Sequence, residues 1–261
     1  MSKKKQALLT VLETKAIYPV FQPIVDLQNG NVVAYESLSR IENKNIDINI
    51  EELFCLAEAY GCVWKLEKLC RDKALKASMN KPSETKIFLN VDGQIFQDSN
   101  FISGFTNRKL EKFGLLNEDI VFEITERTDI ENYVLLQAIM NHYIDQGYQI
   151  ALDDVGAGYS GLNRVVNTTP NYLKADIELV RNIHLSKSKQ SMMKLLVEYC
   201  DEMGLKLIAE GIETQEELEC ICNLHVHYGQ GYYLGLPDCK FNGVSSQALQ
   251  YLMNIHGMIK T

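Results

Sequence analysis

The chain of 261 residues is 46% hydrophobic and 23% charged, a globular composition that excludes intrinsic disorder as its main state. Its net charge of −8 argues against polymeric nucleic acid as a partner. No run reaches the roughly 20 apolar residues of a membrane span, and Thr10, Glu13 and Lys15 break the apolar N-terminal segment too early for a signal peptide. We therefore expect a cytoplasmic protein with no membrane span.

The cysteines do not have the spacing of a metal site. All seven lie at positions 55, 62, 70, 200, 220, 222 and 239. Cys220 and Cys222 precede His225 and His227, but residues two apart on a helix face different directions. The sequence favours free thiols in a reducing compartment over a zinc site.

The first predicted elements form a β-hairpin. β-rich apolar runs at 18–27 and 32–38 flank Gln28-Asn29-Gly30, and Asn-Gly is a strong hairpin signal. Residues 1–15 precede this hairpin as an N-terminal extension or helix. The chain is thus expected to open with an antiparallel pair of strands.

Helices and strands alternate through the rest of the chain. Asn49 followed by Glu52 predicts the start of a helix that continues to Tyr60, and a second helix is expected over 63–79. Later strands are predicted at 86–91, 120–124, 149–152, 172–175, 206–209 and 227–233, and later helices at 131–146, 187–203 and 215–223.

This alternation indicates parallel βαβ units. Two of the later helices begin with capping-box spacing, at Thr128 with Glu131 and at Thr214 with Glu217. Eight strands in about 250 residues is the size of a TIM-type barrel, with one irregularity at the opening hairpin. No linker-like segment interrupts the chain, so we expect a single domain over residues 1–261.

A polar residue lies at or near the carboxyl end of almost every predicted strand. The set is Glu36, Asn90, Glu123, Asp153 with Asp154, Lys174, Glu210 and Gln230. From Glu36 to Gln230 their spacing averages about 32 residues, close to the roughly 31 residues per unit of an eightfold barrel. Strand ends of such a barrel meet at one face, where its active sites lie.

Five carboxylates at one face would repel one another, and divalent cations with oxygen ligands relieve that repulsion. The neighbouring Asp153 and Asp154 can help bridge two ions, an arrangement used for displacement at phosphorus. Each residue alone has a plainer explanation: Glu213 simply precedes the capping Thr214, and an isolated Lys174 would be a surface lysine. The shared register of the whole set argues against that explanation.

The glycines after the fifth strand could be mistaken for a dinucleotide-binding fingerprint. Gly156, Gly158 and Gly161 form GxGxxG, and Asp176 lies 20 residues beyond the first of them. Asp153 and Asp154 would, however, face the pyrophosphate. A loop that closes over the site is the better interpretation.

Eight ordered motifs between Phe21 and Pro237 resemble those of the EAL-domain family of cyclic di-GMP phosphodiesterases. They are Phe21-Gln22-Pro23, Tyr35-Glu36-Ser37-Leu38-Ser39-Arg40, Leu89-Asn90-Val91, Glu123-Ile124-Thr125-Glu126, Asp153-Asp154-Val155-Gly156-Ala157-Gly158-Tyr159-Ser160, Leu173-Lys174-Ala175-Asp176, Ala209-Glu210-Gly211-Ile212-Glu213-Thr214 and Gln230-Gly231-Tyr232. The resemblance implies a TIM-like (β/α)8 barrel with one antiparallel strand near the N-terminus. It also implies a homodimer that hydrolyses cyclic di-GMP to linear pGpG with two Mg²⁺ or Mn²⁺ ions.

The resemblance also implies roles for individual residues. The metal ligands would be Glu36, Asn90, Glu123, Asp153 and, for the second ion, Asp154. The catalytic group would be Glu36, Lys174, Glu210 and Gln230, in which Lys174 holds the attacking water and Glu210 binds or deprotonates it. Gln22, Arg40, Asp176 and Glu213 would contact the substrate, with Arg40 as a phosphate clamp, and Glu126 would anchor the Gly156 loop.

Three departures from the family pattern keep alternatives open. Ser37 replaces the alanine of the family motif, and Val155 and Ala157 replace an aromatic residue and a threonine of the loop. An active phosphodiesterase is the leading hypothesis, and a cyclic di-GMP receptor that barely cleaves is the second. A metal-dependent barrel hydrolase of another family is the third.

Overall fold

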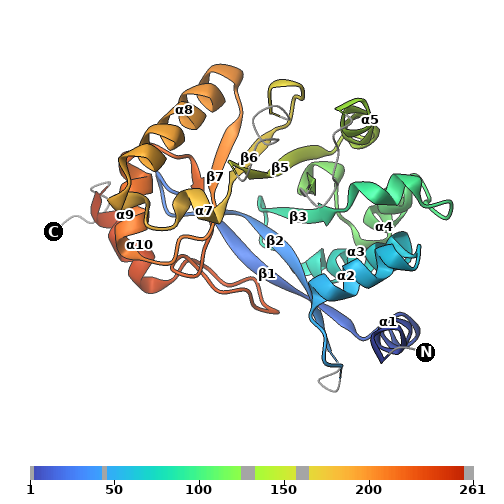
Figure 1. Cartoon of the computed structure of the whole chain (residues 1–261). Helices are drawn as coiled ribbons and strands as arrows, with labels where there is room; N and C mark the ends of the chain where they lie inside the picture. Colours follow the sequence, from blue (N-terminus) through green and yellow to red (C-terminus); the bar gives the residue numbers. More distant parts are fainter. Residues whose placement is uncertain (1–2, 43–45, 125–132, 157–164, 256–261) are drawn as a thin grey trace.

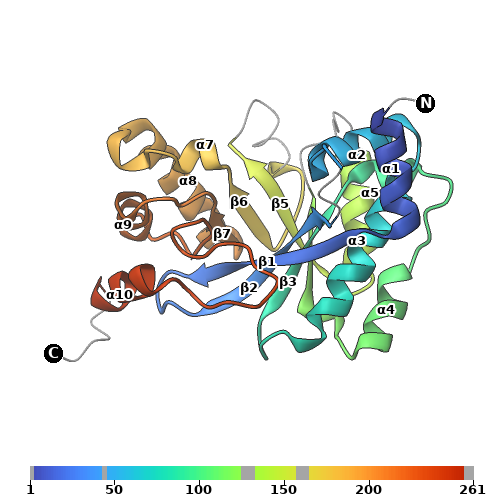
Figure 2. The same ribbon diagram turned by 90° about the horizontal axis from the view of Figure 1, so that it is seen from below.

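The computed structural model describes residues 3–42, 46–124, 133–156 and 165–255. In these ranges eight strands close into a barrel in the order β1 to β8 (Figures 1 and 2). They are β1 (Ile17–Asp26), β2 (Val32–Ile41), β3 (Lys86–Val91), β4 (Ile120–Ile124), β5 (Gln149–Val155), β6 (Tyr172–Ala175), β7 (Lys206–Ala209) and β8 (Tyr228–Gly229). The predicted TIM-like barrel is confirmed.

β1 runs opposite to the other strands of the barrel. It pairs antiparallel with β2 and with β8, whereas the pairings from β2 through β8 are parallel. Gly30 of the connecting turn has a φ of +71°, a left-handed conformation that glycine adopts without steric cost. The expected opening hairpin is therefore confirmed, and Ile17 at the start of β1 lies opposite Ile41 at the end of β2.

Helices surround the barrel (Figure 1). They are α1 (Lys3–Thr14), α2 (Ile50–Ala59), α3 (Val63–Ala77), α4 (Phe105–Phe113), α5 (Tyr133–Ile144), α7 (Ile177–Val180), α8 (Lys187–Met203), α9 (Gln215–Asn223) and α10 (Ser246–Ile255). α1 is the helix expected within residues 1–15. None of the described helices has the length and hydropathy that a bilayer span requires.

Predicted helix starts have the expected chemistry where the structure describes them. Asn49 caps α2 by accepting a hydrogen bond from the Glu52 N–H, and Thr214 and Glu217 form the capping box of α9. The predicted box at Thr128 and Glu131 lies outside the described residues. α4, α7 and α10, which the sequence patterns do not predict, complete the described set.

β8 is shorter than the predicted strand at 227–233. After Gly229 the Gln230 N–H still donates to Ala209, but the chain then bends so that Ile212 N–H donates to the Gln230 carbonyl. A Cβ on Gly231 would lie 2.2 Å from the Ile212 backbone nitrogen. This close backbone contact ends the strand ladder and turns the chain outward.

The inside of the barrel is filled by one apolar layer. It comprises Ile24, Ala34, Phe88, Val121, Ala151 and Ile208, with Tyr172 and Tyr228 packed against it. Residues two apart on a strand share a face. The next inward side chains toward the carboxyl ends of the strands therefore form a second layer above this one.

Candidate active site

The second layer is polar on every strand. Glu36, Asn90, Glu123, Asp153, Lys174, Glu210 and Gln230 each lie two residues after a member of the apolar layer or a tyrosine packed against it. Gln22 lies two residues before Ile24, because β1 runs in the opposite direction. We call these eight residues the polar layer. The strand-end residues predicted to converge are thus brought to one rim of the barrel.

Lys174 lies at the centre of the polar layer and is 1% exposed. Its Nζ is 2.6 Å from Glu210 Oε1 and 2.7 Å from Glu123 Oε1. Glu36 Oε2 and Asp153 Oδ1 are farther away, at 3.5 and 3.6 Å. One cation therefore faces four carboxylates, and the cluster carries an excess of negative charge.

Two amides hold Glu36 in place. Asn90 Nδ2 donates to Glu36 Oε1 at 2.9 Å, and Gln230 Nε2 donates to Glu36 Oε2 at 2.7 Å. Gln230 Nε2 also lies 3.2 Å from Gln22 Oε1, and Gln22 donates to the Gly235 carbonyl at 3.1 Å. Both oxygens of Glu36 consequently have fixed directions before any ligand binds.

Burial and neighbouring charges shift the pKa values of Glu123, Glu210 and Lys174. Burial, together with the Glu36 carboxylate, raises the pKa of Glu123 well above its ordinary value. Burial and the Asp153 carboxylate likewise raise the pKa of Glu210. Burial alone would lower the pKa of Lys174, but the carboxylates of Asp153 and Glu123 outweigh it and raise this pKa. Lys174 therefore remains protonated at neutral pH.

The donor set suits divalent cations. Carboxylate oxygens of Glu36, Glu123 and Glu210 lie within 4.8 Å of one another, as do those of Asp153, Asp154 and Glu210. Glu123 Oε2 and Asp153 Oδ1 are buried and accept no hydrogen bond from the described residues. Buried carboxylate oxygens are costly without a partner, and hard divalent cations prefer oxygen ligands. The residues present therefore fit such ions.

Asp154 lies at an irregularity in β5, just after the regular pairing of Leu152 with Leu173 of β6. The β5–β6 register shifts between Leu152 and Val155, and Asp154 has a φ of +56°. Because of this bulge, the adjacent Asp153 and Asp154 can both lie beside the Glu210 carboxylate. In a regular strand, neighbouring side chains point to opposite faces. Val155, a departure from the family loop, is buried in β5, and Ala157 lies outside the described residues.

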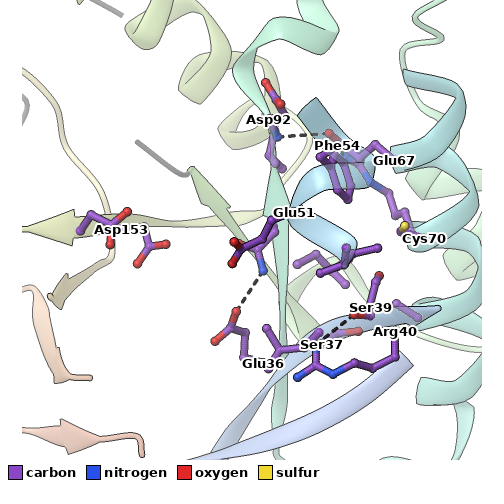
Figure 3. A pocket seen from close by; sticks show the side chains of 18 residues that line it. Glu36, Ser37, Ser39, Arg40, Glu51, Phe54, Glu67, Cys70, Asp92 and Asp153 are labelled. Atoms are coloured by element: carbon purple, nitrogen blue, oxygen red, sulfur yellow. Dashed lines mark hydrogen bonds and ion pairs between the residues drawn. The ribbon is translucent and has the colours of Figure 1, made fainter. Parts of the chain in front are cut away.

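A cavity of about 430 Å³ opens from the polar layer between β2, β3 and helices α2 and α3 (Figure 3). Glu36, Asn90 and Asp153 line one part of it. Glu67 and Cys70 line another. A ligand bound at the rim can therefore extend into this cavity toward α2 and α3.

The remaining predicted site residues have varied positions. Arg40 lines the cavity, where its Nη1 donates to the Ser39 carbonyl at 3.0 Å. Asp176 caps α7 by accepting from the Glu178 N–H at 2.7 Å. Glu213 is exposed, and its N–H donates to Glu217 at 3.0 Å. Glu126 lies outside the described residues.

The cavity also has charged residues that the strand-end pattern does not identify. Glu67 and Arg71 of α3 form an ion pair on its wall, and both are at most 4% exposed. Their i, i+4 spacing is the only sequence signal, and it is shared by many solvent-exposed helix pairs.

Comparisons with known proteins agree with this architecture. The chain is 25% identical over 238 residues to the "Probable cyclic di-GMP phosphodiesterase PdeG" of Escherichia coli K12, covering 89% of this chain and 47% of that protein. It is 28% identical over 240 residues to "Cyclic di-GMP phosphodiesterase PdeL" of the same organism, covering 89% and 65%. The chain thus spans about half to two thirds of the lengths of these two relatives.

Solved structures show the same barrel. A "standalone versatile EAL protein from Vibrio cholerae O395" in its c-di-GMP bound form is 26% identical with a TM-score of 0.76, over 89% of this chain and 97% of that one. BlrP1 of Klebsiella pneumoniae, in a manganese/cy-diGMP complex, is 25% identical with a TM-score of 0.78, over 85% and 56%.

The family match covers most of the sequence. The family model described as "EAL domain" matches residues 5–237, which includes all eight residues of the polar layer. With the barrel, its reversed first strand and the acidic rim already established, the chain belongs to the EAL domain family.

Proposed function

We propose that this chain hydrolyses one phosphodiester bond of cyclic di-GMP to give linear pGpG. The observation that carries the proposal is the polar layer, in which four carboxylates surround Lys174 at the rim that adjoins the cavity. The names of PdeG and PdeL support this substrate. A cyclic dinucleotide is also anionic, so an acidic rim needs cations to receive it.

Two Mg²⁺ or Mn²⁺ ions are the proposed cofactors. Glu36, Asn90, Glu123 and Asp153 would hold them, with Asp154 chiefly on the second ion. The buried oxygens of Glu123 and Asp153 that accept no hydrogen bond from the described residues support this assignment. When bound, such ions supply Lewis acidity and neutralise the negative charge that grows at phosphorus.

Lys174 and Glu210 are proposed to act on the attacking water. Lys174 stays protonated, so its ammonium group can donate to the water oxygen and orient it. Glu210, 2.6 Å from Lys174, accepts the proton of that water, and its raised pKa makes it a stronger base. The water oxygen forms the new bond to phosphorus as the bond to the ribose 3′ oxygen breaks.

Substrate contacts are proposed for the residues around this centre. Arg40 on the cavity wall presents a planar guanidinium that can bind two phosphate oxygens. Gln22 and Gln230 hold one another and Glu36, so they fix the rim on which the substrate lies. Asp176, Glu213 and Glu126 stay predictions as substrate or loop contacts.

The direct test is product formation by the purified protein. Incubation with cyclic di-GMP and Mg²⁺ or Mn²⁺ should yield pGpG on chromatography. Glu36→Ala and Asp153→Ala should abolish turnover and retain the circular dichroism spectrum of the folded chain, whereas Glu198→Ala, at an exposed position on α8, should keep full activity. Absence of pGpG at every protein concentration would overturn the proposal.

The same assay separates an enzyme from a receptor. Calorimetry with Ca²⁺ in place of Mg²⁺ measures cyclic di-GMP binding apart from cleavage. Tight binding with negligible cleavage in Mg²⁺ and in Mn²⁺ would favour the receptor. The proposed homodimer is measured independently, by light scattering on the same sample.

A further inference from the structure

A buried ion pair lies outside the polar layer but on the same cavity. Glu67 and Arg71 are one turn apart on α3 and are 3% and 4% exposed. Both line the cavity that Glu36 and Asn90 also line. Neither belongs to the proposed metal ligands or to the groups that act on water.

Glu67 holds the end of β3. Its Oε2 accepts a hydrogen bond from the backbone N–H of Asp92 at 3.1 Å (Figure 3). Asp92 lies two residues beyond Asn90, whose side chain donates to Glu36 at 2.9 Å. The short segment 90–92 is therefore fixed on one side to α3 and on the other to β2.

Arg71 in turn fixes Glu67. Besides the ion pair, Arg71 donates to Thr106 Oγ1 at 3.1 Å and to the Tyr143 hydroxyl at 3.3 Å. Its guanidinium carbon is 4.8 Å from the centre of the Phe122 ring. These contacts come from α4, α5 and β4, so the Glu67 carboxylate is oriented by elements on several sides.

Stability alone does not account for this pair. Apolar residues of similar volume often replace a buried ion pair without loss of stability, because the charges no longer have to be desolvated. Partners of metal ligands, in contrast, orient those ligands and change metal affinity when they are lost. We propose that Glu67 and Arg71 are positioning residues that hold the end of β3, and through it Asn90, in place for the divalent metal site. This inference rests on the proposed function.

The test replaces both charges together. In Glu67→Met/Arg71→Met the Asp92 N–H loses its acceptor while the volume is nearly kept. We expect Mn²⁺ alone, titrated by calorimetry, to bind about 10- to 100-fold more weakly, with no fall in the thermal midpoint. The matched control, Asp72→Asn/Lys109→Met, removes another ion pair between α3 and α4 and should leave Mn²⁺ affinity within about threefold of wild type.

A second variant restores only the acceptor. In Glu67→Gln/Arg71→Met the amide oxygen can still accept from Asp92, so Mn²⁺ affinity should return most of the way to wild type. This variant also serves if the double methionine variant does not fold. Weak Mn²⁺ binding by the folded glutamine variant, as weak as that of Arg71→Met/Glu67→Ala, would overturn the inference.

Asn90 provides the decisive comparison. If the pair acts through Asn90, then adding the double methionine change to Asn90→Ala should cause no further loss of Mn²⁺ affinity. A full further loss, or wild-type affinity in the folded double methionine variant, overturns the inference. Failure of the wild-type chain to bind Mn²⁺ at all would instead overturn the proposed function.

Discussion

Lys174 carries the only positive charge in direct contact with the acidic group of the described polar layer. Removing one member of a buried charge cluster costs about 3–5 kcal/mol, because the remaining charges lose their partner. We expect Lys174→Met to destabilise the metal-free protein by that amount in urea unfolding. Turnover should be abolished.

The same variant should bind Mn²⁺ at least as tightly as wild type, since a repelling cation has been removed from the site. Calorimetry measures this affinity. Lys194→Met, at an exposed position on α8, is the control and should change neither quantity. Weaker Mn²⁺ binding by Lys174→Met would contradict the proposed charge balance.

Cys70 differs from the exposed cysteines in reactivity. Burial raises the pKa of the Cys70 thiol to about 12, so almost no thiolate forms at neutral pH, and the thiolate is the reactive species. Cys55 and Cys239 are exposed. With iodoacetamide under native conditions, we expect peptide mass spectrometry to find Cys55 and Cys239 modified first. Equal labelling of Cys70 would show that the cavity wall opens.

Sequence reasoning at the residue scale succeeds where a residue's position follows from strand alternation. Glu36 and Glu123 could be predicted because each follows an inward apolar residue by two positions. Glu67 and Arg71 could not, since their burial depends on how α3 packs against α4 and α5. The contacts of Arg71 with Thr106 and Tyr143 join residues far apart in sequence.

Gly211 lies between β7 and α9, where there is no free space for a side chain. It has a φ of +66°, and a Cβ there would lie 2.2 Å from Ile177 Cγ1. Gly61 has a similar φ of +61°, but a Cβ at that position would meet no atom within 4 Å. Alanine at either position incurs the left-handed cost of about 1–2 kcal/mol.

We therefore expect Gly211→Ala to cost about 1–3 kcal/mol more than Gly61→Ala in urea unfolding, because the clash adds to the conformational cost. Since Gly211 directly follows Glu210, turnover should also fall in Gly211→Ala and persist in Gly61→Ala. Equal unfolding free energies for the two variants would contradict the clash.

Capping side chains helped to predict where some helices begin, but they did not identify every helix. Thr214 and Glu217 mark the start of α9. α4 begins after Gly104, which has no capping side chain. α10 does have a signal, because Ser245 Oγ accepts from the Ala248 N–H at 3.2 Å, and a capping serine before an apolar periodicity would have identified it. The early end of β8 depends on the approach of Gly231 to Ile212, which no local pattern encodes.

Over the whole molecule, the acidic rim links metal binding to pH. The raised pKa values of Glu123 and Glu210 mean that the metal-free fold binds protons more readily than the unfolded chain. Protonation of these two carboxyls therefore adds to the stability of the metal-free fold. The added stability is fully present below the ordinary pKa of about 4.5 and is lost as the pH rises through the raised pKa values. Divalent cations need deprotonated ligands and so bind better as protons leave.

We therefore expect the increase in Tm caused by Mn²⁺ to be small near about pH 5 and larger near about pH 8. At a concentration of 100 Kd the stabilisation should reach about 2.7 kcal/mol. Differential scanning calorimetry with and without EDTA measures it, and a larger increase at the lower pH would contradict the assignment.

The barrel itself could be predicted because its evidence is spread over the whole chain. The average of the six strand-to-strand intervals is close to the length of one βα unit, and each interval ends at a polar group near the end of a strand. The distances between carboxylate oxygens depend on how the side chains pack, and so does the cavity beside α3. The spacing of strands along the sequence does not specify this packing.

The reversed direction of β1 determines at which end of the barrel the segment before β1 is attached. In an all-parallel barrel the first strand starts at the base, on the side away from catalysis. Here Ile17 lies beside the end of β2, so α1 joins the barrel at the rim that carries the polar layer, and it packs near α2 and α3. The turn at Gly30 points to the base. A domain fused ahead of α1 is therefore connected to the barrel on the side of the polar layer, whereas a reporter inserted at Gly30 is separated from that layer by the height of the barrel.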